Sequence, residues 1–244
     1  QSSLLGVEAL GAERSITIFG LPMQPTEFAK VSILLAVASY VEMQRSSPLP
    51  PFRFAAILVL GIVIPIYLIY QQPDLGTAII LLVGLLVLGW LVGLPWYVVA
   101  ALLGLVAAYF VLVCIMQPYH LTRILTMLDP WMDPQGDGYQ SIQSLYALGS
   151  GGIFGKGLGL SRQKYLYLPY AHTDFIYAII GEELGLIGAL VVIGMFLALL
   201  WAGMRISRSA ADDFGSMVAG ALTIMLVFQA FLNIGCAIGV FPTT

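Results

Sequence analysis

Six long apolar runs constrain the fold of this chain more than any other feature. They cover residues 25–41, 54–70, 75–93, 95–116, 174–204 and 214–240. Each run approaches or exceeds the ~20 residues that an α-helix needs to cross the hydrocarbon core of a bilayer. Lipid offers the backbone no hydrogen bonds, and the runs are too long for barrel strands, so we expect helices. The predicted fold is an all-α transmembrane bundle forming a single membrane domain, residues 1–244.

The composition agrees with a membrane location. Apolar residues make up 59% of the chain, charged residues 9%, and the mean hydropathy is +0.94. A soluble domain carries roughly 25% charged residues. The formal net charge of −3 predicts no nucleic-acid partner.

Short polar turns join most of the runs, but residues 117–173 form one long connection. Arg45 and Arg53 flank one turn, and Arg205 and Arg208 follow the fifth run. Lys and Arg in short loops favour the cytoplasmic side of a membrane. The same alternation places the 117–173 loop on the outer face, so we expect an extracytoplasmic loop with a polar site.

Charge is concentrated within residues 149–188, which is unusual in a chain this apolar. Asp174 stands where the long loop enters an apolar run, at the boundary of water and hydrocarbon, and is the candidate general base. An Asp in the first turn of a helix also stabilises the helix dipole, so a purely structural role is the alternative. Lys156, Arg162 and Lys164 cluster beside a glycine-rich run and are candidates for binding a phosphate group. A solvated loop is the simpler explanation for any one of them.

Other charged residues lie in or near the predicted helices. Glu27 and Lys30 are three residues apart, hence on one helix face, where they suit either a structural ion pair or a substrate contact. Asp74 follows Pro73 and directly precedes the apolar run 75–93. Its carboxylate could cap the N-terminus of that predicted helix, or it could bind substrate or a cation. Glu182 and Glu183 are adjacent, so we expect at most one of them to face a polar site, and neither is assigned as a metal ligand.

A series of motifs runs in order along the whole chain. Its parts are Gly11 to Arg14, Gln24 to Lys30, Gln72 to Thr77, Asp129 to Trp131, Gly138 to Gln140, Gly149 to Gly152, Gly155 to Gly157, Leu168 to Pro169, His172 to Ile176, Gly181 to Gly185 and Asn233 to Gly235. In this order the chain resembles the family of shape, elongation, division and sporulation proteins. The sequence of residues 163–169 is more typical of the division and sporulation branch of this family. Ser15 departs from the family, in which Trp is common.

The resemblance implies a fold and an activity. The family has ten transmembrane helices, so the six runs would correspond to its fourth to ninth helices. Its activity is a peptidoglycan glycosyltransferase that polymerises lipid II, a disaccharide-pentapeptide on undecaprenyl pyrophosphate, at the outer face of the bacterial cytoplasmic membrane. Asp174 matches the family's catalytic residue. The substrate-binding candidates are Lys156, Arg162, Lys164, Glu27, Lys30, Asp74 and His172.

The resemblance also implies partners. These are lipid II, the nascent glycan, membrane lipids and a class B penicillin-binding protein that crosslinks the glycan. Mg²⁺ or another divalent cation is a candidate cofactor, with its ligands unassigned. A lipid II flippase is the competing function, since a bundle with intramembrane charges also suits transport. A transporter should line a path through the midplane with charge, whereas here the charges gather at one face, which favours the enzyme over a flippase or a scaffold.

Overall fold

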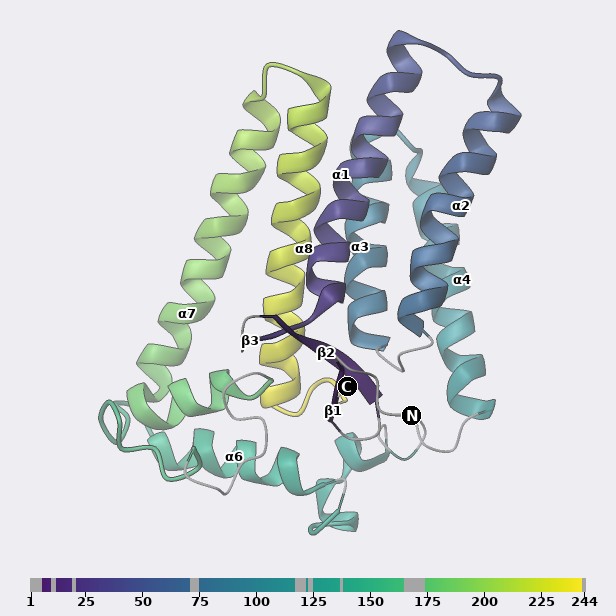
Figure 1. Cartoon of the computed structure of the whole chain (residues 1–244). Coiled ribbons are helices and arrows are strands. Elements are labelled where there is room, and N and C mark those ends of the chain that lie inside the picture. The colour runs from purple at the N-terminus through teal and green to yellow at the C-terminus, as the bar shows by residue number, and fades with distance from the viewer. Residues whose placement is uncertain are drawn as a thin grey trace. The chain divides into compact units, whose positions relative to one another are not determined.

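The computed structural model describes residues 6–9, 12–18, 21–70, 75–116, 122, 125–136, 138–164 and 174–242. Its elements are β1 (Gly6–Ala9), β2 (Ala12–Ile18), β3 (Leu21–Met23), α1 (Pro25–Ser46), α2 (Pro51–Tyr70), α3 (Leu75–Val92), α4 (Trp96–Met116), η1 (Pro130–Met132), α6 (Tyr139–Gly151), α7 (Ile176–Ser209) and α8 (Asp213–Ala237) (Figure 1). All six apolar runs are helices, so the predicted all-α membrane bundle is confirmed. Within the described residues, α7 and α8 are long and apolar enough by themselves to cross a membrane.

The helix boundaries follow from local sequence. Pro25 occupies the first turn of α1, where its missing N–H costs nothing. Gly93, with φ +104°, ends α3, and Pro95 then accepts the first hydrogen bond of the α4 region from the Val98 N–H at 2.9 Å. Gly239, with φ +77°, closes the C-terminal end of α8. Turn residues therefore divide the apolar sequence into separate helices.

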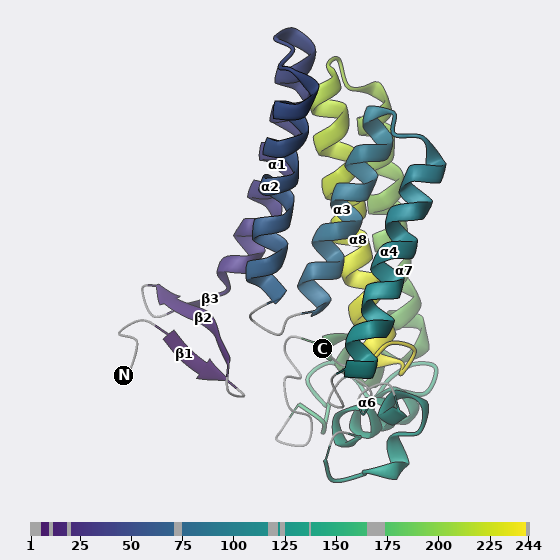
Figure 2. The same ribbon diagram turned by 90° about the vertical axis from the view of Figure 1, so that its right-hand side faces the viewer.

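Two features were not predicted. Strands β1, β2 and β3 form an antiparallel meander that leads directly into α1 (Figure 2). These strands are far shorter than a membrane span, so a search for long apolar runs overlooks them. Helix α6 and the 3-10 turn η1 lie within the 117–173 segment, to which the sequence analysis assigned no element. The single-domain assignment stays a prediction.

The chain forms two compact units. The first comprises Gln1–Val99, Ala202–Met225 and Thr244, and the second comprises Ala100–Trp201 and Leu226–Thr243. In the first unit, Leu34 of α1 packs where α3 and α8 approach, since a Cβ at Gly84 would meet both Leu34 and Met225. Arg45 and Asp213 form an exposed ion pair at the ends of α1 and α8.

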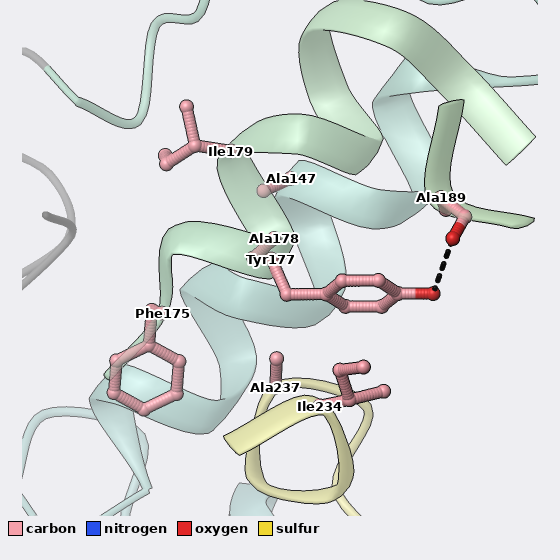
Figure 3. Close-up of a cluster of buried hydrophobic side chains, with 8 residues drawn as sticks. All are labelled: Ala147, Phe175, Tyr177, Ala178, Ile179, Ala189, Ile234 and Ala237. Atoms are coloured by element: carbon pink, nitrogen blue, oxygen red, sulfur yellow. Dashed lines mark hydrogen bonds between the residues drawn. The ribbon is translucent and has the colours of Figure 1, made fainter. Parts of the chain in front are cut away.

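The core of the second unit joins α6 to the first half of α7 and the end of α8 (Figure 3). Its buried residues are Ala147, Phe175, Tyr177, Ala178, Ile179, Ala189, Ile234 and Ala237. Two side-chain hydrogen bonds to backbone carbonyls reinforce the packing: Ser144 Oγ donates to the Ala237 oxygen at 2.6 Å, and Tyr177 Oη donates to the Ala189 oxygen at 3.4 Å. This core fixes the beginning of α7, where the predicted catalytic residue lies.

Candidate active site

Asp174 immediately precedes α7 and its side chain is exposed. The next residue, Phe175, is only 2% exposed and belongs to the buried cluster of the second unit. The Phe175 carbonyl accepts a hydrogen bond from the Ala178 N–H at 3.0 Å, which starts the helix. Because Phe175 is held both by its burial and by this hydrogen bond, the backbone of the adjacent Asp174 is held as well.

Helix α6 approaches α7 through glycine. A Cβ placed on Gly151 would lie 2.0 Å from the backbone oxygen of Gly181, so no larger residue fits without displacing the helices. After Gly151 the chain turns back along α7 as a glycine-rich segment, residues 152–164, which we call the anchored loop. Gly152, Gly155, Gly157 and Gly159 all have positive φ.

The anchored loop is hydrogen-bonded into a break in α7. Gly185 has φ 68° and ψ −166°, which interrupts the helix. The Glu182 and Glu183 carbonyls accept hydrogen bonds from the N–H groups of Lys156 and Gly157, both at 3.0 Å. In return, the Leu186 N–H donates to the Gly152 oxygen at 2.9 Å, and the Ile187 N–H donates to the Ile153 oxygen at 3.3 Å. The loop thereby satisfies backbone groups that the broken helix leaves open.

Glu182 is the main attachment point of the loop. Its buried carboxylate accepts a hydrogen bond from Lys156 Nζ at 2.7 Å and from Ser161 Oγ at 2.6 Å. It also accepts longer hydrogen bonds from the backbone N–H groups of Arg162 and Gln163, at 3.3 and 3.4 Å. A buried carboxylate with this many donors is stabilised in its ionised form.

Glu183 holds the end of the same loop. Lys164 Nζ lies 2.7 Å from Glu183 Oε1, and the Ser161 N–H donates to the same oxygen at 3.3 Å. We had expected at most one of the adjacent glutamates to face a polar site. Both carboxylates are instead used, because the loop curves around α7 and meets each of them.

The structure places the three predicted phosphate-binding cations on this loop, but two of them form ion pairs with α7 and the third does not. Lys156 and Lys164 form ion pairs with Glu182 and Glu183. Arg162 is exposed, and its guanidinium forms no ion pair with any residue that the structure describes. The Gln163 side-chain oxygen is buried without a hydrogen-bond donor among those residues. The three cations and two carboxylates together carry one net positive charge.

Glu27 and Lys30 form the ion pair that their spacing predicts. Lys30 Nζ donates to Glu27 Oε1 at 2.8 Å within α1. Lys30 is almost completely buried, whereas Glu27 is exposed. The pair belongs to the first unit and Asp174 to the second. Asp74 and His172, the remaining predicted binding residues, lie outside the described residues.

The sequence analysis missed the roles of Glu182, Glu183 and Ser161 in binding the loop. A signal was present, since two carboxylates in an apolar helix require partners and the cations of the 149–188 segment are the nearest in sequence. As for metal binding, no group of three or more His, Cys, Asp or Glu side chains is placed to hold an ion in the part of the chain that the structure describes.

These features define an all-α membrane bundle in which a charged, glycine-rich loop is attached to an interrupted membrane helix. The sequence pattern of the FtsW, RodA and SpoVE family, described as cell cycle proteins, matches residues 2–244. The chain belongs to this family, as the resemblance predicted.

Individual relatives agree. Stage V sporulation protein E of Bacillus subtilis (strain 168) is 40% identical over 243 residues, covering 98% of this chain and 66% of the relative. A protein of Trichlorobacter lovleyi named probable peptidoglycan glycosyltransferase FtsW is 37% identical over 246 residues, covering 98% of this chain and 63% of the relative. The chain thus spans slightly less than two thirds of the length of these curated relatives.

A solved structure shares the fold. It is described as "Structural coordination of polymerization and crosslinking by a peptidoglycan synthase complex", and one of its chains superposes with a TM-score of 0.72 at 29% sequence identity. The match covers 99% of this chain and 67% of the solved one. The fold of this chain is therefore similar to that of one chain in the structure so described.

Proposed function

We propose that this chain carries the catalytic part of a glycosyltransferase that polymerises lipid II into peptidoglycan glycan strands. The supporting comparisons are relatives named probable peptidoglycan glycosyltransferase and the structural similarity to a synthase complex. The observation on which the proposal depends is Asp174, an exposed carboxylate held at the beginning of α7 by the buried Phe175.

Asp174 acts as the general base. Its carboxylate accepts the proton of the acceptor sugar hydroxyl while that oxygen attacks the anomeric carbon of the donor sugar. The new carbon–oxygen bond forms as the bond from the anomeric carbon to the lipid pyrophosphate breaks, and the pyrophosphate leaves with the electron pair. Attack opposite the leaving group inverts the configuration at that carbon. Fixing the base by Phe175 reduces the entropy that must be lost at the transition state.

The anchored loop stabilises the departing pyrophosphate. Arg162 is suited to this role, because its guanidinium is exposed and can form two parallel hydrogen bonds with phosphate oxygens. Lys156 and Lys164 keep the loop attached to α7 through their carboxylate partners, so the net positive charge of the loop comes from Arg162.

The reaction scheme uses no metal. Mg²⁺ in phosphate-handling sites is bound by one or two carboxylates together with substrate phosphates. The described residues provide no dedicated cluster of ligands, and the carboxylates of Glu182 and Glu183 are already bonded to the loop. A requirement for a divalent cation therefore remains a prediction from the family resemblance, testable with a chelator.

The membrane setting completes the proposal. We infer a multi-pass protein of the bacterial cytoplasmic membrane with Asp174 on the outer face, where the undecaprenyl-linked substrate presents its sugars. The partner would be a class B penicillin-binding protein that crosslinks the new strands. The similarity to a complex described as coordinating polymerization and crosslinking supports this pairing.

The test compares two activities of the full-length protein in liposomes, with its transpeptidase partner present. Fluorescent lipid II is supplied, and both glycan polymer and transbilayer movement of the lipid are measured. The proposal predicts polymer of many disaccharides from the protein and none from empty liposomes. Transbilayer movement without any polymer would contradict the proposal and favour the flippase.

A further inference from the structure

The anchored loop exposes large apolar side chains. Phe154 is 81% and Leu158 77% exposed, and Ile153 and Leu160 are exposed on either side of them. Gly155, Gly157 and Gly159 separate these residues and adopt positive φ, a conformation in which the chain turns tightly.

This exposure is a fixed property of the loop. Gly155 donates a hydrogen bond to the Gly151 oxygen at 2.8 Å, and Lys156 and Gly157 donate to the Glu182 and Glu183 oxygens of α7, just before the break. The Glu182 carboxylate ties down the following residues through Ser161. Leaving a side chain such as Phe or Leu in water rather than burying it costs about 1.5–3 kcal/mol. A rigid loop with four such side chains therefore requires an apolar covering.

The position of the loop along α7 indicates what could cover its exposed apolar side chains. The backbone bonds of Gly152 and Ile153 place them beside Leu186 and Ile187, which are themselves exposed. The exposed apolar surface continues along α7 through Leu190 and Val191. Since α7 is long and apolar enough to cross a membrane, we expect these exposed residues to face lipid. The apolar side chains of the loop begin at the same level and extend that surface.

The break in α7 fits the same location. Non-helical backbone within a membrane is tolerated only where protein groups satisfy its hydrogen bonds. The four backbone hydrogen bonds exchanged between the loop and residues 182–187 do so at Gly185. In a purely aqueous setting, water could satisfy these groups without a loop.

The charges of the loop suit the boundary between lipid and water. Lys156 lies between Phe154 and Leu158 in sequence and keeps part of its side chain exposed, and Arg162 is exposed after Leu160. Cations on flexible stems that flank apolar side chains are typical of segments resting among phospholipid headgroups.

We propose that residues 153–160 are immersed in the bilayer at the level where α7 enters it, with lipid acyl chains covering Ile153, Phe154, Leu158 and Leu160. The loop is then a membrane-inserted element that fixes the height of α7 relative to the headgroups. This inference does not depend on the proposed enzymatic activity.

The test measures the surroundings of the loop by electron paramagnetic resonance. A spin label is attached at Phe154→Cys or Leu158→Cys in the full-length protein, with Cys114 and Cys236 replaced by Ala. The protein is reconstituted in vesicles of phosphatidylethanolamine and phosphatidylglycerol. Val191→Cys provides the lipid-facing reference, and Gln135→Cys, in the exposed turn before α6, provides the aqueous reference.

Collisions with dissolved oxygen, which concentrates in lipid, are compared with collisions with a water-soluble nickel chelate. Since polar solutes are excluded from hydrocarbon, we expect an oxygen-to-nickel ratio at 154 and 158 about tenfold above that at 135 and close to that at 191. A ratio like that at 135 would overturn the proposal in favour of water. Low collision rates with both reagents would overturn it in favour of a protein segment covering the loop.

Discussion

Two of the three lysine–glutamate pairs in the described residues are built in opposite ways. On α1 the cation is buried and the carboxylate reaches water, since the side chains of Lys30 and Glu27 are 2% and 45% exposed. At α7 the carboxylate is buried and the cation is the more exposed partner, with Glu182 at 1% and Lys156 at 33%. The first pair is local, within one helix, while the second joins residues 26 apart in sequence.

The difference shows what each pair does. A buried ion needs several hydrogen-bonding partners to offset its lost hydration, so the buried member of a pair indicates which group organises its surroundings. Glu182 collects donors from Lys156, Ser161, Arg162 and Gln163, and thereby determines the shape of a whole loop. Glu27 and Lys30 lie on one turn of one helix, so the bond between them does not join two separate elements.

The largest expected effect is loss of the Glu182 carboxylate. Glu182→Ala removes the acceptor of the buried Ser161 hydroxyl and of two backbone N–H groups, and leaves a void beside them. We expect the loop to be destabilised by about 3 kcal/mol, or roughly a hundredfold in its opening equilibrium. Limited trypsin digestion at Lys156 and Arg162 measures this opening.

Glu183→Gln is the matched control, because Glu183 makes fewer bonds to the loop and its amide can still accept the Ser161 N–H. Its trypsin sensitivity should rise by a much smaller factor. Equal sensitivity of the two variants would show that Glu182 is not the principal anchor.

Substituting the glycine at the break in α7 should have the next largest effect on stability. Gly185→Ala combines a positive φ of 68° with a Cβ that would lie 2.4 Å from Gly155 N and from Ile153 O. Gly159→Ala shares the positive φ, at 80°, but its Cβ would meet nothing within 4 Å. We expect the first variant to lose about 3 kcal/mol and the second about 1 kcal/mol in free energy of unfolding. Thermal unfolding in detergent compares them, and identical losses would mean that close contact with the loop contributes nothing.

The pair on α1 should respond asymmetrically. Glu27→Gln removes a charged partner from the buried Lys30 ammonium, whereas Lys30→Met fills the same space with an apolar side chain and leaves Glu27 in water. We expect Glu27→Gln to cost about 2 kcal/mol and Lys30→Met less than half of that. Unfolding in detergent with both single variants and the double variant checks this order, which the reverse ranking would refute.

The smallest effect sharpens the account of Glu182. Ser161→Ala deletes one 2.6 Å hydrogen bond to the carboxylate and keeps Lys156 in place. We expect a loss of about 1 kcal/mol, since the carboxylate retains its other donors. Trypsin digestion should then show a change of about fivefold. A change as large as that of Glu182→Ala would mean that the hydroxyl, rather than the carboxylate network, secures the loop.

Sequence reasoning succeeded where the physical rule is local. Long apolar runs predicted the six long helices α1, α2, α3, α4, α7 and α8, because a span in lipid must be both apolar and helical. The spacing of Glu27 and Lys30 predicted their pair, since residues three apart share a helix face. The position of Asp174 at the beginning of a helix followed from the change in composition at that point.

The remainder depended on tertiary contacts. Helix α6 buries only one large apolar residue, Ile142, and otherwise small ones (Ser141, Ser144, Ala147 and Gly151), so its sequence lacks the apolar run of a membrane helix. The pairing of Lys156 with Glu182 requires the chain to turn back on α7, a path determined by glycine contacts such as Gly151 against Gly181. The interruption at Gly185 could not be predicted from the sequence either, because glycine is common in transmembrane helices that are not interrupted.

If Asp174 is the general base, removing its negative charge should abolish polymerisation without weakening the binding of lipid II. The full-length protein with Asp174→Asn, and with Asp133→Asn as an exposed carboxylate control in the turn before α6, is assayed for lipid II affinity and for glycan polymerisation. We predict that Asp174→Asn binds lipid II normally but polymerises it at least ~100-fold more slowly, as expected when a general base is lost. Asp133→Asn should match the native protein in both respects. Normal polymerisation by Asp174→Asn would contradict the account.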